Sequence, residues 1–236
     1  MDNIVLRGVE LGSVPRVVAI IDRMVAPEKV HDLVRHGCDM LEIRADLFAG
    51  SFDETLAYLG RLRTAVAVPV IGTLRETPGN RDVRLDMFRR LVPLVDCVDI
   101  EIDTSIAGQV IAAAREAKVA VMVSEHDFDK TPDIAALTRI VDTARGMGAR
   151  IVKIAAMART SDDVTRLLRF AQDNRDGGIV AISMGEYGMV SRVLAPLFGS
   201  LLSYGFVEAS VAPGQVSALE LVGEMARYFP QRRARR

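Results

Sequence analysis

Eight short apolar runs, most of them dense in valine and isoleucine, alternate with longer amphipathic segments along the chain. Most of these runs lack strict apolar–polar alternation, which is typical of parallel strands buried on both faces. Their starts are spaced by roughly twenty to thirty residues, about the length of one strand–helix unit. The expected strands are Val17–Ile21, Met40–Arg44, Val70–Leu74, Cys97–Ile102, Val119–Ser124, Ile151–Ala155, Ile179–Met184 and Gly205–Ala209.

Strands and helices in strict alternation predict a closed (β/α)8 barrel, or TIM barrel, formed by a single domain over residues 1–236. The alternative is a doubly wound open sheet, which would typically carry a glycine-rich phosphate turn after its first strand. Residues 21–24 contain no glycine, so the barrel is favoured. The expected helices are Ala26–Gly37, Phe52–Arg63, Arg84–Val92, Gly108–Ala117, Ile134–Gly146 and Ser161–Asp173.

Two further segments lie outside this alternation. A short pair before the first barrel strand, Ile4–Val9 and Gly12–Pro15, is expected to form an N-terminal β-hairpin that covers the bottom of the barrel. The basic tail Gln231–Arg236 is expected to be a solvated, poorly ordered end.

Charge and cysteine content exclude several classes of function. The formal net charge of −1 and the isoelectric point near 6.3 give no indication of nucleic acid or a membrane surface as a partner. Cys38 and Cys97 are too few for a disulfide framework or a zinc site, so we expect both to lie in the core. No apolar run is long enough to cross a bilayer and the N-terminus does not resemble a signal peptide, so a cytoplasmic protein is expected.

The residue that most directly indicates chemistry is Lys153, which is centred in the β-branched run 151–155. An ammonium group buried without a partner is costly, so such an amine tends to lose its proton. A neutral amine in an apolar pocket is a nucleophile, and its usual product with a ketone or aldehyde is a Schiff base. His126, at the end of the preceding expected strand, is a candidate for proton transfer.

Other polar residues also gather at the expected carboxyl ends of strands, where barrel enzymes place their catalytic groups. In isolation each has a structural explanation. Glu42 and Arg44 could form an ion pair at the rim, Asp99 and Glu101 could be interior charges paired with lysine or arginine, and Lys153 could pair with an interior carboxylate such as Glu101. Interior charges on several neighbouring strands, however, require one another or a polar ligand. The strand-end residues are Glu42, Arg44, Asp46, Arg75, Glu76, Asp99, Glu101 and Met184, and Arg192 and Gln215 follow in the last two loops.

The order of these segments resembles that of type I 3-dehydroquinate dehydratases, enzymes of the third step of the shikimate pathway. The resemblance extends over nearly the whole chain. The matching segments are Glu42-Ile43-Arg44-Ala45-Asp46, Gly72-Thr73-Leu74-Arg75, Asp99-Ile100-Glu101, Ser124-Glu125-His126-Asp127-Phe128, Val152-Lys153-Ile154-Ala155, Ser183-Met184-Gly185, Ser191-Arg192, Phe198-Gly199-Ser200 and Ala212-Pro213-Gly214-Gln215.

The resemblance implies a Schiff base between Lys153 and the C3 ketone of 3-dehydroquinate, with His126 as the proton donor and acceptor. It implies no metal, no cofactor and a homodimer. By the same analogy Arg192 pairs with the substrate carboxylate, and Glu42, Arg44 and Arg75 hold its ring hydroxyls. Met184 packs against the ring and Gln215 closes over it. Asp46, Glu76, Asp99 and Glu101 are candidates for supporting roles.

The chain departs from the family pattern in two places. The family usually has Glu-Gly-Gly a few residues after the third-strand arginine, with the glutamate near the catalytic histidine, whereas here residues 75–80 read Arg-Glu-Thr-Pro-Gly-Asn. Glu76 or Glu101 is then the candidate carboxylate partner of His126. The lid usually reads Ser-Ala-Pro-Gly-Gln, and here Val211 takes the place of its serine.

The sequence leaves two competing functions open. A class I aldolase also forms a lysine imine in a barrel, but it often binds phosphate through glycine-rich turns after the last two strands, and no such turn is evident. A non-catalytic barrel that binds an acidic metabolite would have an ordinary lysine at position 153 and would form no imine.

Overall fold

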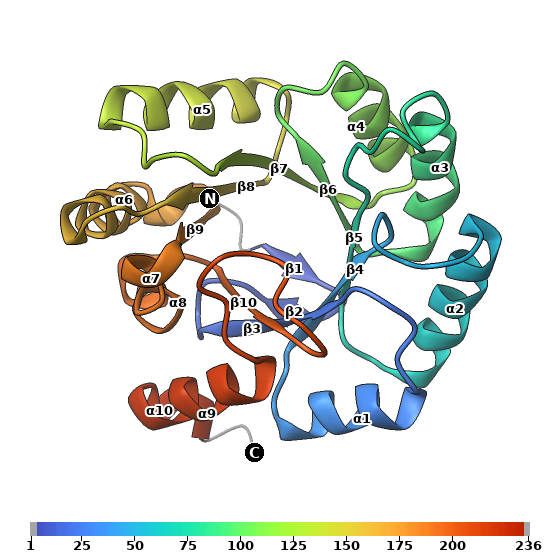
Figure 1. Ribbon diagram of the computed structural model, residues 1–236, viewed down its shortest axis with the longest axis horizontal. Coiled ribbons are helices and arrows are strands. Elements are labelled where there is room, and N and C mark those ends of the chain that lie inside the picture. The colour runs from blue at the N-terminus through green and yellow to red at the C-terminus, as the bar shows by residue number, and fades with distance from the viewer. Residues whose placement is uncertain (1–3, 234–236) are drawn as a thin grey trace.

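A barrel of eight parallel strands forms the centre of the molecule and confirms the expected architecture (Figure 1). The computed structural model describes residues 4–233. Neighbouring strands pair in the order β10-β3-β4-β5-β6-β7-β8-β9, and the Leu201 amide donates to Ile179 O at 2.8 Å where the two end strands meet. The strands are β3 (Arg16–Ile21), β4 (Met40–Arg44), β5 (Val70–Thr73), β6 (Cys97–Glu101), β7 (Ala120–Asp127), β8 (Ile151–Met157), β9 (Ile179–Met184) and β10 (Leu202–Phe206).

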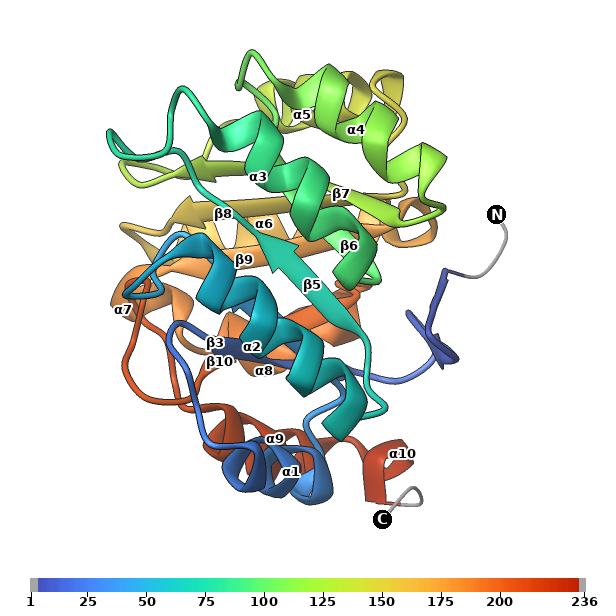
Figure 2. The same ribbon diagram turned by 90° about the vertical axis from the view of Figure 1, so that its right-hand side faces the viewer.

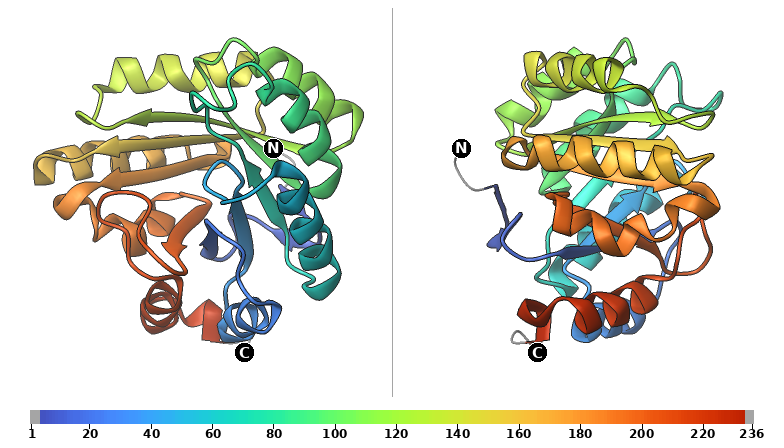
Figure 3. Two further views of the ribbon diagram at one scale, coloured as in Figure 1. Left: turned by 45° about the vertical axis from the view of Figure 1, so that its right-hand side comes forward. Right: turned by 90° about the vertical axis from the view of Figure 1, so that its left-hand side faces the viewer.

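Helices surround the barrel, as Figure 3 shows from two sides. Several of the long helices begin at a hydroxyl residue whose side chain and a following acid satisfy the first backbone amides, for example Ser51 with Glu54 and Ser217 with Glu220. The helices are α1 (Pro27–His36), α2 (Phe52–Ala65), α3 (Arg84–Leu91), α4 (Ala107–Glu116), α5 (Ile134–Gly146), α6 (Ser161–Asp173), α7 (Gly185–Gly188), α8 (Ser191–Leu194), α9 (Ala218–Tyr228) and α10 (Pro230–Arg233), with 3-10 turns η1 (Val92–Leu94), η2 (Arg175–Gly177) and η3 (Ala195–Phe198).

Two apolar layers explain why the strands read as unbroken apolar runs. Side chains such as Val152 and Ile154 point outward and belong to the layer between the strands and the helices. Side chains such as Ile20, Met122 and Ile182 point inward and fill the barrel interior. Lys153 lies between Val152 and Ile154, so its side chain points inward.

The N-terminal hairpin lies at the end of the barrel where the strands begin (Figure 2). Its strands are β1 (Val5–Leu6) and β2 (Val9–Glu10), and Leu6 belongs to the inner apolar cluster. The hairpin was expected, but its second arm was wrongly placed at Gly12–Pro15. The chain reverses earlier, at Arg7 and Gly8, which both have positive φ as a two-residue hairpin turn requires.

The last barrel strand also differs from the expectation. It covers Leu202–Phe206, whereas Gly205–Ala209 was predicted. The prediction was wrong because Ser203 and Gly205 interrupt the apolar pattern of the strand. A Cβ atom at Gly205 would lie 2.5 Å from the Cα of Ala218, so only glycine allows α9 to approach the strand this closely.

The basic tail is better ordered than expected. The side chain of Arg232 is buried, and its guanidinium donates to Asp39 Oδ2 at 2.6 Å. The expectation of a solvated tail is therefore wrong for Arg232, and residues 234–236 lie outside the described part of the chain. Cys38 and Cys97 are both free and buried, as expected. Among the described residues no helix has the length and apolar character needed to span a membrane.

Candidate active site

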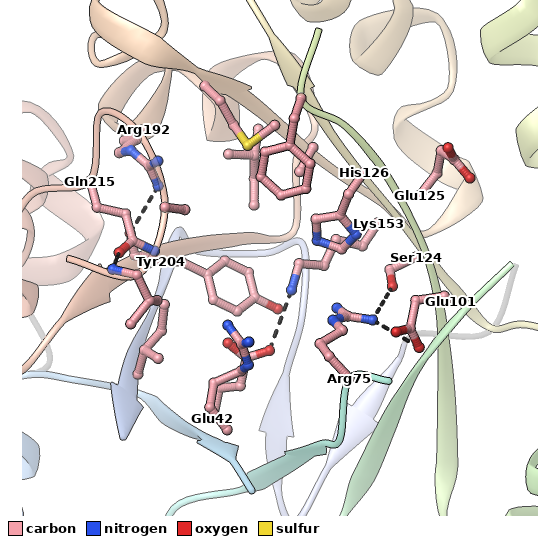
Figure 4. Close-up of a pocket in the computed structure, with 18 of the residues that line it drawn as sticks. Glu42, Arg75, Glu101, Ser124, Glu125, His126, Lys153, Arg192, Tyr204 and Gln215 are labelled. Atoms are coloured by element: carbon pink, nitrogen blue, oxygen red, sulfur yellow. Dashed lines mark hydrogen bonds and ion pairs between the residues drawn. The ribbon is translucent and has the colours of Figure 1, made fainter. Parts of the chain in front are cut away.

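A cavity of about 400 Å³ opens at the end of the barrel where the strands terminate (Figure 4). It brings together most of the residues that the sequence singled out. Asp46, Glu76 and Asp99 are not part of its lining. The predicted residues that line it are Glu42, Arg44, Arg75, Glu101, His126, Lys153, Met184, Arg192 and Gln215.

The amine of Lys153 lies between two buried carboxylates. Its Nζ is 2.9 Å from Asp99 Oδ2 and 3.4 Å from Glu42 Oε1. It also lies 4.3 Å from the centre of the Tyr204 ring, within the range of a cation–π contact. The pairing of Lys153 with an interior carboxylate is therefore confirmed, but its partners are Asp99 and Glu42 and not Glu101. The Glu42 carboxylate also accepts the hydroxyl of Thr73 at 2.8 Å.

Asp99 connects this lysine to the third strand. It is fully buried, accepts the Ser124 hydroxyl at 2.6 Å and lies 2.9 Å from Arg75 Nη2. Burial alone would raise the pKa of Asp99, but the cations Arg75 and Lys153 hold it well below the usual value for an aspartate. Asp99 is thus a fixed negative charge that orients two cations of the cavity.

Glu101 belongs to a second network, which includes an arginine that sequence reasoning missed. Its carboxylate contacts Arg75 Nη1 at 3.3 Å and forms an ion pair with Arg84 at the start of α3. Arg84 is 1% exposed and also donates from Nε to the carbonyl of Leu74 at 2.8 Å. In sequence this arginine could not be told from a solvated residue of a helix surface.

Glu76 does not line the cavity and is not the carboxylate partner of His126. Its Oε1 accepts from Arg81 at 2.9 Å on the protein surface. Neither Glu76 nor Glu101 makes a hydrogen bond to His126 within the described part of the chain, so the choice between them as its partner was wrong. The carboxylate that acts electrostatically on the histidine is Asp99.

His126 is held as a neutral base. Burial, together with the nearby cations Arg75 and Lys153, lowers its pKa to about 3, and the opposing effect of Asp99 is smaller. Its ring stacks on Phe128 with 6.2 Å between the ring centres. Figure 4 shows His126 beside Lys153, on the neighbouring strand, with both side chains directed into the cavity. A neutral imidazole in this position can accept a proton near pH 7.

Arg44 is fixed by Asp46 and not by Glu42. Its Nη2 lies 2.7 Å from Asp46 Oδ2 and its Nε lies 3.1 Å from Oδ1, so the two groups pair through two parallel hydrogen bonds. The rim pair between Glu42 and Arg44, one alternative that the sequence left open, is not formed. Asp46 supports the site from behind by holding the guanidinium of Arg44 at the cavity wall.

Arg192 has an unusual set of partners for a buried cation. It is 4% exposed, and it donates to the carbonyls of Gly214 at 2.6 Å, Pro213 at 3.2 Å and Tyr204 at 3.3 Å. No carboxylate among residues 4–233 pairs with it. Burial without such a partner lowers the pKa of Arg192 to about 10. The arginine anchors the lid and leaves a cationic surface at the cavity.

The lid after β10 contributes Val211, Ala212 and Gln215 to the cavity wall. Gln215 Oε1 accepts the amide of Val211 at 2.8 Å, so the side chain is held within the loop. The hydroxyl of Ser210 donates to Ala212 O at 2.8 Å, and Ser210 is not part of the lining. The departure noted in sequence therefore places an apolar side chain, Val211, where the cavity is closed.

Further lining residues were not assigned from the sequence. Tyr204 was missed because the last strand was placed too late. Ser124 lies within a matching segment, but its hydrogen bonds to Asp99 and Arg75 depend on side-chain geometry across strands. Among residues 4–233, no three His, Cys, Asp or Glu side chains are arranged to hold a metal ion. The remaining lining residues are Ile20, Asp103, Glu125, Phe128, Ala155 and Ile182.

The chain is similar to known proteins over most of its length. The family described as type I 3-dehydroquinase matches residues 17–225. The 3-dehydroquinate dehydratase of Methanococcoides burtonii is 34% identical over 221 residues, covering 90% of this chain and 94% of that protein. That of Methanosarcina barkeri is 37% identical over 201 residues, covering 78% and 83%.

Solved structures give the same result. The type I 3-dehydroquinate dehydratase of Clostridium difficile, with covalent modified comenic acid, matches with a TM-score of 0.84 at 25% identity and 98% coverage of both chains. The Geobacillus kaustophilus 3-dehydroquinate dehydratase matches with a TM-score of 0.80 at 26% identity, covering 97% of this chain and 98% of that one. On the sequence match over most of its length, the chain belongs to the type I 3-dehydroquinase family of hydro-lyases.

Proposed function

We propose that this protein dehydrates 3-dehydroquinate to 3-dehydroshikimate, the third step of the shikimate pathway, through a Schiff base on Lys153. The observation that carries the proposal is the buried amine of Lys153, which faces the cavity beside a neutral imidazole. The covalent modified comenic acid in the Clostridium difficile relative is consistent with a nucleophile in this type of cavity.

In the proposed reaction His126 accepts a proton from the Lys153 ammonium group, which is paired with Asp99 and Glu42. The neutral amine then attacks the C3 ketone, and His126 returns the proton to the departing oxygen, so loss of water gives a cationic imine. This cation acts as an electron sink that stabilises the carbanion or enamine formed next to it, so the neutral His126 can remove a proton from C2. The electrons then expel the C1 hydroxyl, which receives a proton from His126 and leaves as water. Hydrolysis of the imine releases the product and restores the amine, so the net change is the loss of one water molecule.

The balance of buried charge supports a substrate that carries a carboxylate. Arg192 alone among these buried cations is held only by carbonyls, so the anion that completes it is expected to come from the ligand. Each of the other cations pairs with at least one carboxylate. The paired groups are Lys153 with Asp99 and Glu42, Arg75 with Asp99 and Glu101, Arg84 with Glu101, and Arg44 with Asp46.

The remaining roles follow the family resemblance. Glu42, Arg44 and Arg75 line the cavity and are proposed to contact the ring hydroxyls. Met184 lines the same wall and is proposed to contact the ring, while Gln215 closes over it from the lid. We also propose that the protein is cytoplasmic and forms a homodimer. Sedimentation analysis of the purified protein would test the dimer.

The direct test of the activity is an absorbance assay with purified protein and 3-dehydroquinate. The conjugated product absorbs in the ultraviolet and the substrate does not, so turnover appears as rising absorbance. A chain that binds the substrate without any rise, at concentrations that saturate binding, would be a binding protein and not a dehydratase. Appearance of carbon–carbon cleavage products would instead indicate an aldolase.

A further inference from the structure

A second hollow, of about 580 Å³, lies at the opposite end of the barrel from the candidate active site. It forms where the hairpin turn meets the loops that precede β6, β7 and β8, and Figure 2 shows this hairpin at the end where the strands begin. The basic residues that line the hollow are Arg7, Arg115, Lys118 and Arg150. Among the described residues the lining contains one acid, Asp96.

The positive charge of this hollow is not neutralised by the protein. Asp96 is already engaged, because its Oδ2 lies 2.6 Å from Arg63 Nη1 and accepts the Val70 amide at 2.8 Å. Within residues 4–233, the side chains of Arg7 and Arg115 donate only to backbone carbonyls, at 3.4 and 3.2 Å.

Lys118 and Arg150 form no ion pair or hydrogen bond through their side chains with any residue in the described range. The chain as a whole has a net charge of −1, so this cluster is a local excess and not part of a generally basic surface.

Two of these cations occupy backbone positions that favour other residues. Arg7 and Lys118 have φ angles of 43° and 58°, and they are the only non-glycine residues in the described range with positive φ. A left-handed conformation costs a non-glycine residue roughly 1–2 kcal/mol. At the corresponding ends of α1 and α5 the chain uses Gly37 and Gly148. The hairpin turn accounts for the conformation of Arg7, whereas Lys118 keeps a strained backbone where other helix ends use glycine. Strained residues tend to persist where function requires their side chains, and the side chain of Lys118 lines the hollow.

We propose that this hollow binds a small phosphate-bearing anion. Phosphate groups carry up to two charges and several acceptor oxygens, which suits a concave group of guanidinium and ammonium donors. Exposed ion pairs are individually weak, so a multiply charged ligand is needed to gain useful affinity here. The proposal does not depend on the catalytic function, because the site lies at the other end of the barrel.

Titration calorimetry with pyrophosphate and inorganic phosphate, at constant ionic strength, tests the proposal. The full-length protein should bind pyrophosphate, with acetate at equal concentration giving no binding. The double variant Lys118→Gly, Arg150→Gln should weaken pyrophosphate binding by about fivefold or more. Arg139→Gln is the matched control, because Arg139 is an exposed arginine of α5 that does not line the hollow.

Two measurements distinguish pyrophosphate binding at this hollow from misfolding of the variant and from binding in the catalytic cavity. Without ligand, Lys118→Gly should raise the thermal midpoint by about 2 °C or more, because glycine relieves the left-handed strain, so a loss of binding could not be attributed to misfolding. Arg192→Gln, in the catalytic cavity, should bind pyrophosphate as the unmodified protein does. Equal binding by the double variant and the unmodified protein would overturn the proposal, as would loss of binding in Arg192→Gln alone.

Discussion

Replacing Arg192 tests how the cavity recognises an acid. The guanidinium is 4% exposed, and its partners within the described part of the chain are carbonyls of the lid and of β10. A substrate carboxylate would therefore supply the anionic partner that these residues do not. A hydrogen bond to a charged group contributes about 1.5–3 kcal/mol, which corresponds to roughly a 10- to 150-fold change in binding. Arg192→Ala is therefore expected to raise KM at least tenfold. Arg192→Lys should also weaken binding, because an ammonium group cannot pair with a planar carboxylate through two parallel hydrogen bonds.

Removal of Arg192 has two effects on binding, loss of the lid contacts and loss of the ion pair, and the assay must distinguish them. Arg192 also holds the lid through Gly214 and Pro213, so its removal loosens the lid for every ligand. Steady-state kinetics or direct binding should therefore compare 3-dehydroquinate with an analogue that lacks the carboxylate, in both the unmodified protein and Arg192→Ala. Loss of the lid contacts weakens both ligands alike, whereas loss of the ion pair weakens only the acid. If the variant still prefers the acid to the neutral analogue by the same factor, the carboxylate lies on another cation, such as Arg44 or Arg75.

Four further outcomes are expected. Lys153→Ala and Lys153→Arg should both reduce turnover to background in the absorbance assay; the arginine variant keeps a cation beside Asp99, so activity in it would argue against covalent chemistry. His126→Ala should lower kcat by about 100-fold or more while an imine adduct still forms slowly, and near-normal turnover would make the histidine structural. Burial holds the pKa of His126 at about 3 in the folded protein, against 6.5 when unfolded, so the unfolded state binds more protons below about pH 6.5. The free energy of unfolding should therefore fall as pH drops below about 6.5. Chemical denaturation should show a weaker decline for His126→Gln between pH 6.5 and 4.5. Arg84→Met should reduce the free energy of unfolding by about 3 kcal/mol, because it removes one partner of a buried ion pair with Glu101, and Arg84→Lys should recover part of this loss in denaturant titrations.

Much of the fold was predictable because burial on both faces produces unbroken runs of valine and isoleucine. The strand around Lys153 is an example, since every neighbour of the lysine is apolar. The last strand was misplaced because Ser203 and Gly205 interrupt its run, and the requirement for glycine comes from the close approach of α9, which only the folded chain reveals. The same error concealed Tyr204, whose ring faces Lys153.

The members of the site were easier to predict than their partners. Position at a strand end indicates that a side chain reaches the cavity, as it does for Glu42 and His126. Which carboxylate meets which cation depends on side-chain geometry across strands. Lys153 pairs with Asp99 and not with Glu101, whereas Glu101 pairs with Arg84 from the start of α3. No local pattern distinguishes that buried arginine from its exposed neighbours.

Reductive trapping can show whether Lys153 forms a covalent imine with the substrate. Protein incubated with 3-dehydroquinate and then borohydride should lose activity and gain the mass of one reduced ligand. Peptide mapping should place this mass on Lys153, and the Lys153→Arg variant should remain unlabelled under the same conditions. Continued turnover with no adduct on Lys153 would contradict the mechanism, even if the protein proved to be a dehydratase.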